Sequence, residues 1–282
     1  MTSAFTASTD PHAAFRASLL DGLTRSPKKT EPKYLYDERG SELFDQITTV
    51  PEYYVTRIEA AIMRERLPEI AERLGKGVSV IEPGAGNGSK LSKLMSSLAQ
   101  PEAAAPLDIS KAYVEAAADR LETDHPELRV EAMQGDFTED FHDAIEHAGL
   151  EEPVLYFPGS TLGNFEIEDA QRLLRVFRRS LGSRGRLLLG VDLVKPADVL
   201  IPAYDDAQGV TAAFNLNLLH RANRELDADF DTEAFHHEAR WNEERSRVEM
   251  HIVCDADQTV AIGGAYVAIL VRGDVGSVKA AV

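Results

Sequence analysis

The stretch from Val78 to Ser89, VSVIEPGAGNGS, restricts the fold of this chain more than any other. An apolar segment rich in β-branched residues leads to Glu82, then to glycines, and then to the polar start of a helical pattern. This order is typical of a strand, a tight turn and a helix N-terminus. Glycines such as Gly84 and Gly86 can adopt positive φ and let the backbone approach a ligand closely. The stretch predicts a nucleotide-binding corner, although an ordinary turn between a strand and a helix has the same pattern.

Two details of the corner restrict the class of nucleotide that it can bind. Ser89 stands where the dinucleotide fingerprint GxGxxG has its third glycine. Glu82 stands at the strand end, where a carboxylate would repel a pyrophosphate but suits hydroxyl groups or a cation. S-adenosylmethionine has a sulfonium, an ammonium and a ribose but no phosphate. It is therefore the nucleotide cofactor that we expect here.

Strands and helices alternate after the corner, as expected for a parallel, doubly wound α/β sheet of the Rossmann-like type. We predict helices at 89–98, 111–122 (capped by Ser110) and 166–181, and strands at 103–109, 128–133, 153–158 and 185–193. Ligands of such sheets bind at the carboxyl ends of the strands. The polar residues that follow these strands are therefore the candidate site.

The flanking segments have different patterns. Before the corner we predict helices at 12–24 and 56–74, the second with a capping box formed by Thr56 and Glu59. After Val194 we predict a loop carrying Tyr204, a helix at 210–226 and an antiparallel pair at 236–242 and 247–254. The apolar last stretch could add one or two strands. The expected domains are 1–57 (N-terminal part of a substrate lobe), 58–194 (core), 195–264 (inserted lobe) and 265–282 (C-terminal tail).

Three candidate positions lie at or just after the ends of predicted strands, and each has a simpler alternative. Asp108 could accept hydrogen bonds from ribose hydroxyls, or it could cap the next helix. Asp136 and Phe137 could contact an adenine, or they could be a turn aspartate beside a core phenylalanine. Asn164 could face the transferred group and its acceptor, or it could cap the following helix.

Charge and composition argue against several functions. Acidic residues number 47 and basic residues 30, a formal charge of −17, so a nucleic-acid partner is not expected. The N-terminus lacks the pattern of a leader peptide, and no apolar run reaches about eighteen residues, so we expect a cytoplasmic protein that does not enter membranes, and a monomer. Cys254 is the single cysteine, and the histidines and acids lack the spacing of a metal site.

Eight strings together resemble the histidine-specific methyltransferases of ergothioneine biosynthesis. They lie at 33–47, 51–57, 82–86, 106–110, 135–137, 158–165, 192–195 and 203–215. The likeness runs from about residue 16 to about 264. It implies a class I fold that binds S-adenosylmethionine, with a smaller α+β substrate lobe. It also implies trimethylation of the α-amino group of L-histidine, which gives hercynine.

The resemblance also implies roles for individual residues. The cofactor pocket falls on Tyr36, Gly84, Lys90, Asp108, Asp136 and Phe137, to which the corner adds Glu82 and Gly86. The amino-acid pocket falls on Tyr53, Asn164, Tyr204 and Met250. Methyl transfer from a sulfonium depends mainly on positioning the amine and excluding water. Asn164 and Tyr36 are therefore the expected catalytic residues.

Beyond Gly264 the sequence departs from the family, which continues there with a Glu-x-Ser string that recognises the imidazole. A different apolar segment, 265–282, stands in its place. A truncated or frame-shifted gene product would explain this departure, and the loss of closing strands would expose a sheet edge. Two alternatives follow: an N-methyltransferase for another amino acid or aromatic amine such as tryptophan, or a cofactor-binding remnant with impaired catalysis.

Overall fold

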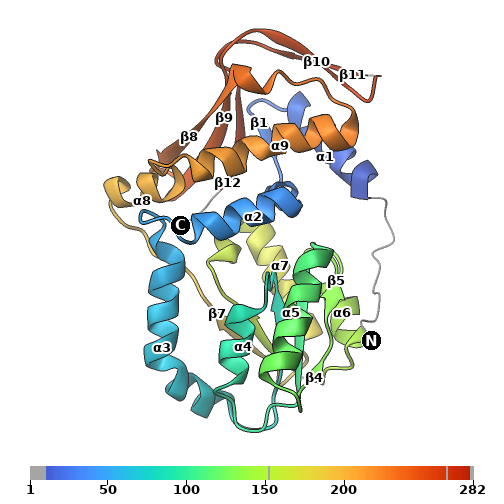
Figure 1. The fold of residues 1–282 in the computed structure, drawn as a ribbon, viewed down its shortest axis with the longest axis vertical. Coiled ribbons are helices and arrows are strands. Elements are labelled where there is room, and N and C mark those ends of the chain that lie inside the picture. The colour runs from blue at the N-terminus through green and yellow to red at the C-terminus, as the bar shows by residue number, and fades with distance from the viewer. Residues whose placement is uncertain (1–10, 152, 265, 280–282) are drawn as a thin grey trace. The chain divides into compact units, whose positions relative to one another are not determined.

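The computed structural model describes residues 11–151, 153–264 and 266–279, which fall into two compact units. The first unit is Ile58–Val191. The second unit combines the N-terminal segment that ends at Arg57 with the segment that begins at Asp192. Helix α3 (Tyr54–Leu74) begins in the second unit and continues into the first (Figure 1).

The first unit is built on a parallel sheet. Its strands are β2 (Ser79–Pro83), β3 (Ala103–Asp108), β4 (Arg129–Val130), β5 (Met133–Gln134), β6 (Val154–Phe157) and β7 (Arg186–Leu189). They are ordered β4-β3-β2-β6-β7, with β5 also paired to β3. The chain proceeds outward from β2 through β3 and then returns to β6 on the other side of β2. This reversal makes the carboxyl end of β2 the switch point where α/β sheets bind ligands.

Helices cover both faces of this sheet because neighbouring strand residues point to opposite faces. The helices after the corner are α4 (Ser89–Met95), α5 (Lys111–Asp124), α6 (Phe141–His147) and α7 (Ile167–Ser180). On β2, Val80 packs in a core with Leu91 of α4, whereas Ile81 packs in a separate core with Phe177 of α7. The doubly wound α/β class expected from the sequence is therefore present.

The second unit packs helices against a mixed sheet, in which β1 and β12 are parallel and the other neighbours are antiparallel (Figure 1). Its helical elements are α1 (Pro11–Thr24), η1 (Pro32–Leu35), α2 (Glu38–Ile47), α8 (Ala197–Tyr204), α9 (Val210–Leu226) and η3 (Thr232–Ala234). Strands β1 (Lys28–Thr30), β12 (Val275–Lys279), β9 (Arg247–Cys254) and β8 (Phe235–Asn242) form the sheet in that order, and β10 (Gln258–Ile262) pairs with β11 (Tyr266–Leu270). Phe214 and Leu218 of α9 are buried in the same core as Val248 and Met250 of β9.

Several predicted elements need correction. Thr56 is not a helix cap, because α3 already begins at Tyr54, and the side chain of Glu59 is used elsewhere. Ser110 stands at the N-cap position of α5 but makes no side-chain capping bond. The loop expected around Tyr204 is instead helix α8. This helix contains Pro202, a residue that usually disfavours a helix interior, and its residues Leu200 and Ala203 are buried.

The remaining differences concern element lengths. Helix α4 ends at Met95, the strand expected at 128–133 is split into β4 and β5, and the strand expected to reach residue 193 ends at Leu189. Helix α6 was not predicted. The stretch after Cys254 contributes three strands, β10, β11 and β12. Within the described part of the first unit, β7 is an edge strand of the sheet, and Leu187 on it is 41% exposed.

Candidate active site

The glycine corner folds as a chain of left-handed turns. Gly84, Gly86 and Gly88 have φ values of 68°, 54° and 70°. A Cβ atom at Gly88 would lie 2.9 Å from the Cα atom of Ala117 in α5, so both the dihedral angle and the close approach require glycine there. At Gly84 and Gly86 the nearest atoms to such a Cβ are ring carbons 3.9 and 3.6 Å away. The corner is therefore tight where Gly88 meets Ala117 of α5 and has more room at Gly84 and Gly86.

Asp108, at the end of β3, is tied to the corner. Its Oδ2 accepts the N–H of Gly86 at 2.9 Å, and its Oδ1 accepts the N–H of Ser110 at 2.9 Å. The capping alternative is wrong, because Ser110 holds the N-cap position of α5, and Asp108 instead binds the N–H of that residue together with the corner. Burial raises the pKa of Asp108, although the bonds from Ser110 and Gly86 act in the opposite direction. A carboxylate has about four acceptor positions, so Asp108 can still accept a hydroxyl donor.

Glu82 is a buried carboxylate at the end of β2. It is 1% exposed, and its Oε2 has no hydrogen-bond partner among the described residues. Burial raises its pKa well above the usual value, while the ammonium of Lys90 lowers it. An unpartnered buried acceptor is costly. A ligand that brings hydrogen-bond donors or a positive charge to this corner would satisfy it, and this fits a cofactor with an ammonium and ribose hydroxyls.

Lys90, in the first turn of α4, is paired with a residue that the sequence analysis assigned to a helix cap. Its Nζ lies 2.6 Å from Oε2 of Glu59. The other carboxylate oxygen of Glu59 accepts the N–H of Gly159 at 2.6 Å. Glu59 has no local signal for this role, because its partners lie 31 and 100 residues away in the sequence.

Asp136 and Phe137 follow β5. The Oδ1 of Asp136 accepts both the N–H and the hydroxyl of Thr138, at 2.9 and 2.6 Å, which is the turn geometry of the simpler alternative. The ring of Phe137 packs edge-on against Phe157 and Phe165, with centroids 5.6 and 6.3 Å away. A ring carbon of Phe137 is also the atom nearest to a Cβ placed at Gly84. The phenylalanine therefore both packs in the core and borders the corner.

Asn164 is the last residue of η2 (Thr161–Asn164), which follows β6. The capping alternative is wrong, because the N-cap position of α7 is held by Glu166. The side-chain amide of Asn164 is half-buried and makes no hydrogen bond within the part of the chain that the structure describes. Its donor and acceptor are both available to a ligand.

The predicted tyrosines gather in the second unit around two phenylalanines. The ring of Tyr36 lies 5.6 Å from Phe44 and 5.4 Å from Phe214. Tyr53 lies 6.3 Å from Phe44 and meets the ring of Tyr204 edge-on at 6.0 Å. Tyr36 and Tyr204 thus belong to one aromatic cluster, although they are 168 positions apart in the sequence. Burial raises the pKa of the Tyr204 phenol, so it stays a neutral donor.

Met250 lies in the core of the same unit. It is 4% exposed and pairs across the sheet with Ala239 of β8. Nearby in the same unit, Asn215 donates to Nδ1 of His237 at 2.9 Å, and Nε2 of His237 lies 2.8 Å from the carbonyl oxygen of Tyr204. This pattern requires neutral His237 with its proton on Nε2, and burial lowers the pKa of this imidazole. His237 therefore anchors the segment that carries Tyr204.

A second group was missed by the sequence analysis. The hydroxyl of Tyr54 donates to Oδ2 of Asp192 at 2.5 Å, and Lys195 pairs with the other oxygen of that carboxylate. The ammonium of Lys195 also lies 4.7 Å from the centre of the Tyr54 ring. Burial, followed by the bond to Asp192, raises the pKa of Tyr54. Asp192 and Lys195 belong to one of the family-like strings, which was the available signal.

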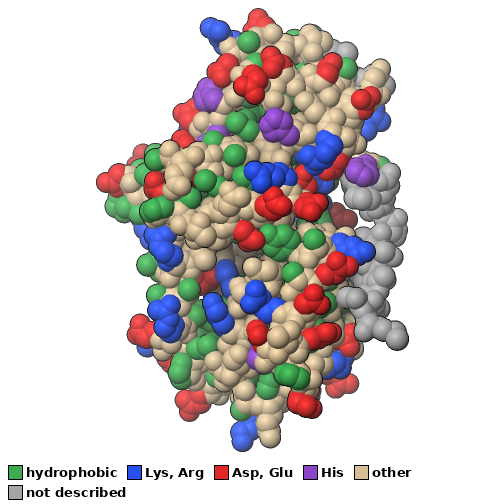
Figure 2. Space-filling view, viewed as in Figure 1, with side chains coloured by type: hydrophobic (Ala, Val, Ile, Leu, Met, Phe, Trp, Pro, Cys, Tyr) green, Lys and Arg blue, Asp and Glu red, His purple; other side chains and the backbone are tan. Residues whose placement is uncertain are grey.

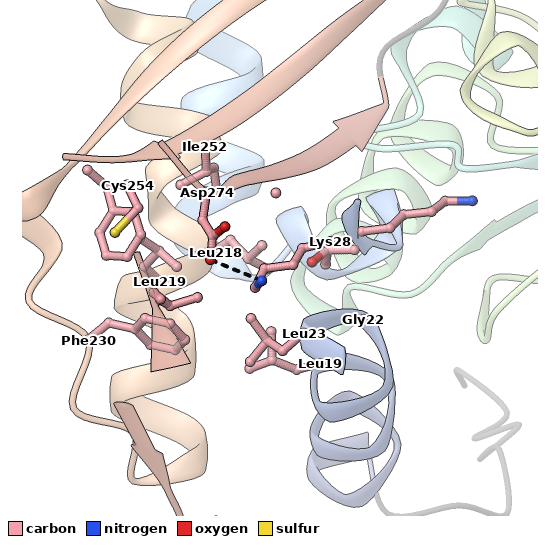
Figure 3. Close-up of a pocket in the computed structure, with 15 residues that line it drawn as sticks. Leu19, Gly22, Leu23, Lys28, Leu218, Leu219, Phe230, Ile252, Cys254 and Asp274 are labelled. Atoms are coloured by element: carbon pink, nitrogen blue, oxygen red, sulfur yellow. Dashed lines mark ion pairs between the residues drawn. The ribbon is translucent and has the colours of Figure 1, made fainter. Parts of the chain in front are cut away.

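A pocket in the second unit contains none of the predicted site residues (Figure 3). It is mostly apolar and includes Leu19 and Leu23 of α1, Leu218 and Leu219 of α9, and Cys254. At this pocket Lys28 pairs with Asp274 at 3.1 Å. The pocket is lined mainly by apolar side chains and by none of the candidate residues, so it is not the candidate site.

Within 11–151, 153–264 and 266–279, no group of histidine, cysteine or acidic side chains is arranged to hold a metal ion. The helices in those ranges include none long and apolar enough to cross a membrane. Figure 2 shows acidic and basic side chains interspersed on the visible face, without a continuous basic surface.

The strand order, the switch point at β2 and the acids at the carboxyl ends of β2 and β3 are those of a class I methyltransferase fold. A family model described as "Histidine-specific methyltransferase, SAM-dependent" matches residues 15–274. The chain belongs to this family. The match continues past Gly264, where the sequence analysis expected the likeness to end, so the segment up to 274 is part of the family pattern.

Curated relatives agree with this assignment. The chain is 40% identical over 255 residues to the histidine N-alpha-methyltransferase of Mycobacterium tuberculosis (strain CDC 1551 / Oshkosh), covering 89% of this chain and 78% of that protein. It is 31% identical over 202 residues to ergothioneine biosynthesis protein 1 of Neurospora crassa, covering 70% of this chain and 23% of that protein. Among solved structures, a DhpI-SAM-HEP complex aligns with a TM-score of 0.37 and 18% identity over 84% of this chain and 82% of that one. This score is low, so the strand order and the family match carry the fold assignment.

Proposed function

We propose that this chain transfers methyl groups from S-adenosylmethionine to the α-amino group of L-histidine, three in succession, to give hercynine. The observation that carries the proposal is the family match over residues 15–274, which includes every candidate site residue. The geometry of the glycine corner supports it, since Glu82 offers an unpartnered buried acceptor and Asp108 is fixed beside Gly86.

The first unit has the groups that the cofactor needs. When bound, S-adenosylmethionine supplies an electrophilic methyl group on its sulfonium. Asp108 would accept hydrogen bonds from the ribose hydroxyls, and Lys90 would neutralise the carboxylate of the methionine part. Asp136 and Phe137 would contact the adenine. Gly84 and Gly86 would let the backbone approach the cofactor.

The amino acid would be held by polar groups that bring no strong base. Tyr53, Tyr204 and Asn164 would bind its carboxylate and α-amino group, and Met250 would lie toward its side chain. Tyr36 and Asn164 would orient the amine. The nucleophile is a neutral amine lone pair, so the residues must position it and exclude water rather than take part in covalent chemistry. Tyrosine hydroxyls and an amide can do this without becoming charged.

The test is product analysis with the purified chain. Incubation with S-adenosylmethionine and L-histidine should give successive mass gains of one, two and three methyl groups, with none at equal concentrations of other amino acids. Tryptophan belongs in the panel because a relative 25% identical over 227 residues is a 4-dimethylallyltryptophan N-methyltransferase. Methylation of tryptophan but not histidine would contradict the proposed substrate. Cofactor binding without methylation of any amine would identify a chain that binds the cofactor but does not catalyse.

A further inference from the structure

The carboxylate of Glu59 joins two segments of the first unit that the proposed function uses separately. Its Oε2 lies 2.6 Å from the ammonium of Lys90, which begins α4. Its Oε1 accepts the N–H of Gly159 at 2.6 Å, just after β6 and five residues before Asn164. The side chain of Glu59 is 17% exposed, so both bonds are shielded from solvent.

The surroundings of Glu59 form a fitted socket. A Cβ atom at Gly190 would lie 2.5 Å from Oε1 of Glu59 and 3.1 Å from Cα of Pro158. Gly190 does not need a positive φ, so its lack of a side chain serves this close approach. The backbone around it is itself fixed, because Gly190 donates to Phe157 and accepts from Ser160 at 3.0 and 3.1 Å. The ends of β6 and β7 therefore have a defined place for one carboxylate oxygen.

We propose that Glu59 is a positioning residue that sets Lys90 for the cofactor carboxylate and fixes the loop that carries Asn164. The inference depends on the proposed function for the roles of Lys90 and Asn164. A lysine ammonium has three donors, so the bond to Glu59 leaves others for a bound carboxylate. Holding the flexible lysine chain in place before binding removes an entropy cost from the binding step.

The two bonds of Glu59 can be separated by substitution. Glu59→Gln keeps an oxygen that can accept from Gly159 but loses the ion pair with Lys90. Glu59→Ala loses both. Glu65→Gln is the matched control, since Glu65 lies on the same helix with a side chain that is 72% exposed. Three readouts are compared: cofactor affinity by calorimetry, kcat for the methylated amine, and hydrogen exchange of a peptide spanning 158–166.

The proposal predicts a different result for each variant. Glu59→Gln should weaken cofactor binding by about tenfold, as expected for one lost charged hydrogen bond, with kcat and loop exchange close to those of the wild type. Glu59→Ala should weaken binding similarly, lower kcat by about tenfold or more and accelerate exchange in the loop, because the Gly159 N–H loses its acceptor. Glu65→Gln should leave all three readouts unchanged.

Several outcomes would overturn the inference. One is equal loss of folded protein in both Glu59 variants with unchanged affinity and kcat for the folded fraction, which would indicate a purely structural role. Another is unchanged loop exchange in Glu59→Ala. A wild-type chain that binds no S-adenosylmethionine would also overturn it. If the wild type binds the cofactor but methylates an amine other than histidine, the proposed function fails. The different results predicted for Glu59→Gln and Glu59→Ala would then be measured with that amine.

Discussion

Tyr54 donates its hydroxyl to Asp192 across 138 positions of sequence, and this bond joins the first turn of α3 to the segment that follows β7. Both residues belong to the second unit, at the two points where the chain leaves that unit and returns to it. Asp192 is 13% exposed at its side chain and is also paired with Lys195. The carboxylate of Asp192 thus binds both Tyr54, near the point where the chain leaves the second unit, and Lys195, just after the chain returns to it.

Removal of the Tyr54 hydroxyl should lower stability moderately. We expect Tyr54→Phe to reduce the free energy of unfolding by about 1.5–3 kcal/mol, the range for a hydrogen bond to a charged group. Urea denaturation followed by tryptophan fluorescence measures it, because Trp241 lies in the second unit. A change no larger than that of an exposed substitution such as Glu233→Gln would contradict this role.

Asn164→Ala tests the placement of the amide at the reaction. We expect kcat to fall by about 10²-fold, because positioning of a reacting group carries much of the rate. Cofactor affinity should change little, since the side chain of Asn164 contacts no residue of the glycine corner through a hydrogen bond in the described chain. Steady-state kinetics and calorimetry separate the two effects. Unchanged turnover would refute the assignment of Asn164.

Glu82→Gln should stabilise the protein while it weakens cofactor binding. Burial raises the pKa of Glu82 well above its ordinary value of 4.5, so the folded state holds this proton more tightly than the unfolded state. The contribution of this group to the free energy of unfolding is greatest below pH 4.5 and declines as the pH rises above that value. Glutamine removes that decline. Urea denaturation of both proteins at several pH values between 5 and 8 should show that the free energy of unfolding decreases less with rising pH in the variant. Parallel plots of this free energy against pH would contradict the prediction.

His237 should produce the opposite dependence on pH. Its pKa is lowered below 6.5 by burial, so on acidification the unfolded chain takes up a proton before the folded chain does. The free energy of unfolding therefore decreases as the pH falls below about 6.5 and is unaffected above it. His237→Gln should reduce this loss. The control is His220→Gln on the exposed side of α9, which should keep the wild-type profile between pH 5 and 7. An unchanged profile in His237→Gln would assign the loss to other groups.

The local patterns of the sequence were sufficient for the corner, the alternation of strands and helices, and helix α9. Gly84, Gly86 and Gly88 report backbone angles that other residues rarely adopt, and a buried parallel strand requires an apolar run, so both features can be read without knowing the neighbours. The family-like strings added the candidate residues Tyr36, Tyr53 and Tyr204. The same local reading misplaced Glu59, because the start of α3 allowed a capping box that the fold does not form.

What the sequence determined by itself is thus the type of fold and the chemical groups that stand at its strand ends. The tertiary structure decided which groups meet: Glu59 with Lys90 and Gly159, Tyr54 with Asp192, and Tyr53 with Tyr204. The physical reason is one of range. Backbone angles and apolar periodicity act over a few residues, whereas a buried carboxylate or phenol takes the partner that packing brings to it from a distant part of the chain.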